Sequence, residues 1–145
     1  MNLSGRFIGK LRLEYIDGRT WRLINPDDPD MFVFILDDGR SIIPPDGMIT
    51  DFASIPRIVW NILPPCGDGP RGKWGPGAVV HDRIYKIGKI NGHPVSRHEA
   101  DHVLKACNEA MMVAPDKIAI IHDALVVGGF VAWNNYREKE QVEEP

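Results

Sequence analysis

The hydrophobic pattern of the chain changes its period close to Asp51. Before this point apolar and polar residues alternate, as in Arg6–Tyr15, which is typical of half-buried β-strands. After it, apolar residues recur every three or four positions, which indicates amphipathic helices. We therefore predict an α+β fold, in which a small N-terminal antiparallel sheet over residues 1–50 precedes a C-terminal bundle of three to four helices over residues 51–136.

The turn and capping residues give the expected bounds of these elements. The expected strands are Arg6–Tyr15, Thr20–Ile24, Met31–Leu36 and Ser41–Ile43. The expected helices begin at Ser54, near Gly77, at the capping box that starts with Ser96, and at Pro115. The last helix is apolar nearly all round as far as Trp133, so it is either the central core helix or a contact for another subunit. We expect residues 137–145 to form a charged, frayed tail.

Length and charge narrow the class of protein. A chain of 145 residues fits one domain, which we predict to span residues 1–145. The net charge of −3 predicts no nucleic-acid partner, because phosphate binding normally requires a basic surplus. The most apolar stretch is interrupted by His122, Asp123 and two glycines, so we predict no transmembrane segment.

Three chemically reactive side chains share one side of the helix expected over residues 77–88. His81 and Tyr85 are four residues apart and stack along the helix, with Asp82 just beyond them. Antiparallel pairing with the next helix would bring Asp101 to the His81 ring. A neutral imidazole is a competent base for water, and a carboxylate on its far nitrogen fixes the tautomer. We predict a catalytic His81–Asp101 dyad, with Tyr85 donating to Asp101 and Asp82 holding a hard cation.

A non-catalytic interpretation of the same residues stays open. A core histidine that bonds Asp101 has the same geometry without a reaction, and a tyrosine such as Tyr85 is more often a core aromatic residue with a satisfied hydroxyl than a catalytic group. Asp82 could instead accept a hydrogen bond from a backbone amide. Catalysis requires a cleft open to solvent above His81, whereas a fully sealed ring would end the catalytic hypothesis.

The His-Asp-x-x-Tyr motif followed by Ala-Asp on the next helix resembles the phospholipase A2 superfamily, especially its disulfide-poor bacterial and viral branches. The resemblance covers about residues 66–111. It implies His81 as general base, Asp101 as its partner and Asp82 as a calcium ligand. It also implies calcium-binding carbonyls in a Gly-rich loop, either at Gly67 and Gly69 or within residues 74–77.

The motifs Thr50–Arg57, Ala78–Tyr85 and Ser96–Asp101 together are similar to an uncharacterised family of tailed-phage and prophage proteins, a domain of unknown function. This resemblance implies a phage-encoded, virion-associated hydrolase that acts on host-envelope lipid or ester. The alternative is a non-catalytic component of a phage tail or neck, with other virion proteins as partners. In both cases the chain is made in the cytoplasm of the bacterial host.

Four further residues have a functional and a structural interpretation. Asp51 is either another metal ligand or a turn residue that bonds its own backbone. The pair His98 and His102 has the spacing of zinc ligands, but no carboxylate or thiol is nearby in sequence, so an exposed helix face is favoured. His122 falls on an apolar stripe and is expected to point into the core or an interface.

Overall fold

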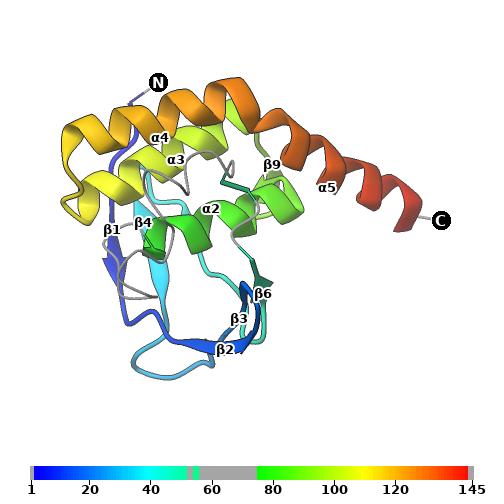
Figure 1. The fold of residues 1–145 in the computed structure, drawn as a ribbon. Coiled ribbons are helices and arrows are strands. Elements are labelled where there is room, and N and C mark those ends of the chain that lie inside the picture. The colour runs from blue at the N-terminus through cyan, green and yellow to red at the C-terminus, as the bar shows by residue number, and fades with distance from the viewer. Residues whose placement is uncertain (1, 52–53, 56–74, 144–145) are drawn as a thin grey trace.

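The computed structural model describes residues 2–51, 54–55 and 75–143. Antiparallel sheets in the N-terminal part precede four helices, which confirms the α+β prediction. The helices are α2 (Gly75–Ile87), α3 (Arg97–Ala110), α4 (Pro115–Gly128) and α5 (Phe130–Glu143). Figure 1 shows α2, α3 and α4 stacked on one side of the molecule, with most of the strands on the other.

The N-terminal half contains two small sheets rather than the single sheet that we predicted. One sheet has the order β1 (Gly5–Ile8), β4 (Val33–Leu36) and β5 (Ser41–Ile42). The other has the order β2 (Leu13–Asp17), β3 (Thr20–Leu23) and β6 (Ile49–Thr50).

The expected strand Arg6–Tyr15 is broken at Gly9, where φ is +80°. A Cβ atom at this position would lie 2.0 Å from the carbonyl oxygen of Met31, so only glycine fits. The break sends the chain from the first sheet into the second.

A short hairpin after α2 was absent from the sequence prediction. Its strands are β8 (Lys89–Ile90) and β9 (His93–Pro94), joined by a two-residue turn. Both turn residues, Asn91 and Gly92, have positive φ angles, of 51° and 79°. The Asn-Gly pair is therefore a type I′ turn signal that the sequence does contain.

The prediction of one helix from Pro115 to Trp133 was wrong. The chain bends by 53° between α4 and α5, near Gly129. No single helix in the described ranges is long and apolar enough to cross a membrane, although α4 and Phe130–Glu140 together meet that test as a bent pair.

The prediction of a frayed tail from Arg137 onward was also wrong, because α5 continues to Glu143. This helix projects beyond the end of α2 (Figure 1). Arg137 anchors it. Its Nη2 atom donates to the carbonyl oxygens of Tyr85 and Lys86, at 2.6 and 2.8 Å. These carbonyls belong to the last turn of α2, so α5 caps α2.

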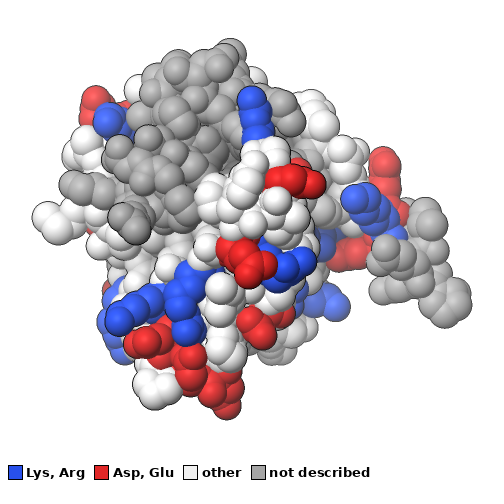
Figure 2. Space-filling model, turned by 60° about the horizontal axis from the view of Figure 1, so that its bottom comes forward, with Lys and Arg blue, Asp and Glu red and all other residues white. Residues whose placement is uncertain are grey.

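The core lies between the sheets and the helices, and α2 is its centre. Gly77 allows the close approach of α2 to α3, because a Cβ atom there would lie 2.9 Å from Cβ of Cys107. Cys107 itself is a buried free thiol. On the face seen in Figure 2, basic side chains gather at the lower left, next to acidic ones.

Candidate functional site

The predicted meeting of His81, Tyr85 and Asp101 is confirmed. His81 and Tyr85 come from α2 and Asp101 from α3. Nε2 of His81 lies 2.9 Å from Oδ1 of Asp101, and the Tyr85 hydroxyl donates to the same oxygen at 2.6 Å. The rings of His81 and Tyr85 also contact each other, with centroids 4.1 Å apart. The helical spacing therefore places these three side chains correctly.

Ser54 is a fourth member of this network. Its Oγ atom lies 3.1 Å from Nδ1 of His81. We predicted Ser54 as the cap of a helix, and the residues of that helix lie outside the described ranges. The signal that could have found it is the Thr50–Arg57 motif, which accompanies the His-Asp motif in the family resemblance.

The hydrogen-bond partners determine the tautomer of His81. The carboxylate of Asp101 only accepts, so Nε2 must carry a proton that it donates to Oδ1. In the neutral ring Nδ1 then accepts the proton of the Ser54 hydroxyl. Both ring nitrogens of His81 are thus satisfied.

The network is sealed from solvent. The exposed fractions are 0% for His81 and Tyr85, 1% for Ser54 and 2% for Asp101. Burial is the main cause that raises the pKa of Tyr85, and the nearby Asp101 carboxylate raises it further, so this hydroxyl stays protonated as a donor. The His81 side chain therefore has no solvent-exposed surface.

Arg97 joins α3 to α4 at the edge of the network. Its Nη1 atom donates to the carbonyl oxygen of Leu125 at 2.7 Å and lies 3.5 Å from Oδ2 of Asp101. Gly129 also lies against the network: a Cβ atom at this position would be 2.6 Å from the Tyr85 hydroxyl. The α4–α5 bend is thus packed directly on the network.

Asp82 is buried next to this network but is not part of it. Its exposed fraction is 0%, and neither carboxylate oxygen makes a hydrogen bond of good geometry. Nζ of Lys86 is 3.6 Å from Oδ2. Burial raises the pKa of Asp82, and Lys86 and Thr50 oppose this rise only partly. Asp82 is therefore a buried acid whose charge Lys86 and Thr50 offset only partly.

The described residues do not form a complete calcium site. Asp51 is exposed but close enough to Asp82 to raise its pKa. Gly67 and Gly69 lie outside the described ranges. The alternative expectation, a Gly-rich loop over residues 74–77, was wrong for Gly75–Gly77, because these residues form the first turn of α2. In the part of the chain that the structure covers, no three His, Cys, Asp or Glu side chains converge on a metal position.

One comparison with known proteins decides the family. The family model for a protein of unknown function, DUF1353, matches residues 30–125, which include all three motifs of the sequence resemblance. The chain belongs to the DUF1353 family. Comparisons with curated proteins and with solved structures gave no significant match.

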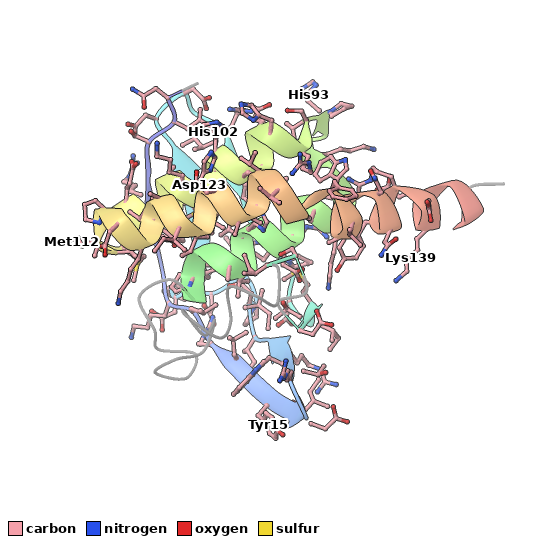
Figure 3. The ribbon with its side chains drawn as sticks, turned by 45° about the horizontal axis from the view of Figure 1, so that its top comes forward. Tyr15, His93, His102, Met112, Asp123 and Lys139 are labelled. Atoms are coloured by element: carbon pink, nitrogen blue, oxygen red, sulfur yellow. The ribbon has the colours of Figure 1, made fainter. Side chains whose placement is uncertain are left out.

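The DUF1353 chain also has a row of three histidines on the outer side of α3 and α4. The ring of His102 lies between those of His98 and His122, with centroid distances of 4.5 and 4.7 Å. Figure 3 shows His102 beside α4, away from the strand that carries Tyr15. His98 is exposed as predicted, but His102 is half-buried. His122 is half-buried against His102 rather than inside the core.

Proposed function

We propose that this DUF1353 protein is a non-catalytic component of a larger assembly, and that the network around His81 is a structural core. The sequence resemblance to tailed-phage proteins suggests a phage tail or neck as that assembly. Other virion proteins would then be its partners.

The complete enclosure of His81 is the observation that carries this proposal. A general base must exchange a proton with a reacting water or hydroxyl group. Nδ1, the nitrogen that would do so, faces Ser54, and Nε2 faces Asp101. A buried polar group with all its hydrogen bonds made stabilises a unique packing of the elements that supply it. Here those elements are α2, α3 and the turn at Ser54.

The outer face of α4 and α5 supports a role in assembly. Four apolar side chains near the bend are at least half exposed: Val126, Val127, Phe130 and Val131. Clustered exposed apolar residues on a protein surface are typical of contact sites for other proteins. The His81 network thus buries polar side chains, whereas the region of the α4–α5 bend exposes apolar ones.

The hydrolase alternative has less support. It needs access to His81, and it needs further donors beside Asp82 if calcium is involved. Ser54, His81 and Asp101 do follow one another as in a hydroxyl–imidazole–carboxylate series. Such a series also forms when the three groups only satisfy one another.

Release of fatty acid from mixed phospholipid vesicles, with and without calcium, separates the two functions. We expect no release by the wild-type protein under either condition. In a host that carries the gene within a prophage, we expect mass spectrometry to detect the chain in purified phage particles.

Two variants make the vesicle experiment decisive. His81→Ala removes the ring, and Asp82→Asn removes the acid without altering the hydrogen bonds of His81. Calcium-dependent release by the wild-type protein that Asp82→Asn abolishes, with the circular dichroism spectrum unchanged, would overturn the proposal. Absence of the chain from purified particles would rule out a phage tail or neck as the assembly.

A further inference from the structure

A half-buried cation without a partner lies on the side of α2 opposite to the network. Arg83 makes no hydrogen bond or ion pair with any residue that the structure describes. Burial lowers the pKa of its guanidinium group, and no carboxylate opposes this effect. Arginine heads that leave water are normally paired, because desolvation of a charge is costly.

Arg83 lines a cavity of about 230 Å³ between β5, the end of α2 and the β8–β9 hairpin. Lys89 contributes a second cation to the lining, and the apolar part comes from four isoleucines, Ile42, Ile43, Ile87 and Ile90. None of the described residues that line this cavity is acidic. It therefore combines positive charge with an apolar wall.

The cavity has a defined shape because its two sides are tied together. The backbone amide of Ser41 in β5 donates to Oδ1 of Asn91 in the hairpin turn, at 3.0 Å. Next to it, Arg40 pairs with Glu99 of α3 at 2.6 Å, so this arginine is already neutralised. Arg83 and Lys89 are the cations here that remain without a carboxylate partner among the residues described.

We propose that this cavity binds a small organic anion, with its charged group at Arg83 and a short apolar body against the isoleucines. Arginine donates through a planar fork that matches carboxylate and phosphate oxygens, and Lys89 adds a second positive charge. The volume is smaller than that of typical drug-sized pockets, so the ligand is short. The proposal does not depend on the proposed function.

Titration of the ¹⁵N-labelled protein with hexanoate, hexyl phosphate, acetate and hexanol, followed by NMR, tests this inference. We expect saturable shifts of the amides of Ile43, Arg83 and Gly92 with hexanoate, with hexyl phosphate or with both. Which of the two anions binds more tightly identifies the headgroup. Acetate is expected to bind more weakly, and hexanol is expected to cause no saturable shift.

Matched charge variants show whether Arg83 is responsible. Arg83→Gln is expected to weaken binding of the preferred anion by about tenfold, because a charged hydrogen bond is lost. Lys117→Gln removes one positive charge at an exposed position in the first turn of α4, which does not line the cavity, and is expected to leave binding unchanged. The inference is overturned if neither anion binds saturably, if hexanol binds as tightly as the anions, or if Arg83→Gln binds like the wild type.

Discussion

The contact between α2 and α3 and the outer face of α4 and α5 are opposite in character. The first is polar and fully buried, and its histidine, tyrosine, serine and aspartate satisfy one another. The second is apolar and exposed, with Val127 at 76%. Ordinary burial preferences would place these residue types the other way round.

This contrast separates the region whose side chains are all paired within the chain from the region whose apolar side chains stay exposed. Within α2 and α3 every polar group of the His81 network finds its partner inside the chain. At the bend between α4 and α5, apolar groups lack a cover in the isolated chain. Four substitutions test this contrast, and they are given in order of decreasing expected effect.

Asp101→Ala should have the largest effect, because it leaves both His81 and Tyr85 buried without an acceptor. We expect the free energy of unfolding to fall by about 3 kcal/mol, measured by urea denaturation. The control Asp123→Ala removes an exposed aspartate from α4 and should change the free energy of unfolding by less than about 0.5 kcal/mol. Equal effects of the two variants would contradict a structural role for the network.

Gly129→Ala should be the next most damaging, since its new Cβ atom would lie 2.6 Å from the Tyr85 hydroxyl and 2.8 Å from the carbonyl oxygen of Leu125. The backbone at Gly129 is helical, with φ of −68°, so the cost comes from overpacking alone. We expect a loss of about 2 kcal/mol in the same measurement. In a Tyr85→Phe background the alanine should cost less, because only the contact with the Leu125 carbonyl remains; an unchanged cost would show that the Tyr85 hydroxyl is not what opposes the alanine.

Asp82→Asn should raise stability at neutral pH. Because the folded-state pKa of Asp82 is raised, the folded protein keeps a proton that the unfolded chain has already released. The free energy of unfolding of the wild type therefore falls as pH rises from the usual carboxyl pKa of about 4 to the raised value, by at most about 1.4 kcal/mol per pH unit. Melting curves of both proteins from pH 4 to 8 should diverge with rising pH. If the melting temperatures of the two proteins changed in parallel with pH, the predicted loss of wild-type stability with rising pH would be wrong.

A calcium titration adds a control to that comparison. If Asp82 held calcium, the ion would raise the melting temperature of the wild type and not that of Asp82→Asn. We expect calcium to leave both unchanged.

Val127→Ser should have the smallest effect on the isolated chain, less than about 0.5 kcal/mol, because its side chain is already in water. Melting curves at two protein concentrations test this expectation. A loss that appears only at the higher concentration would mean that a second copy covers the face.

The sequence predicts the part of the site that depends on helical spacing. His81 and Tyr85 are four positions apart, and the capping box at Ser96 fixes where the helix that carries Asp101 begins. The cap is present, with Oγ of Ser96 accepting from the amide of Glu99 at 3.0 Å. These are local features, so periodicity is sufficient to place them.

Contacts between distant segments could not be predicted in this way. Ser54 reaches His81 from a turn 27 residues earlier, and a helical wheel contains no information about such a partner. The wheel also indicates which side of α2 carries His81 but not what covers that side. The break at Gly9 is similar, because the atom that requires glycine there belongs to Met31.

The helix α5 has two parts with different practical value. The part up to Glu140 completes the end of α2. The guanidinium group of Arg137 donates to two carbonyl oxygens of α2, and its Nε atom lies 3.0 Å from Oε2 of Glu140. The residues after Glu140 are not needed for this contact. A fluorescent label, an affinity tag or a shortened chain end can therefore be placed after Glu140, whereas a boundary before Arg137 would leave the core helix open at its last turn.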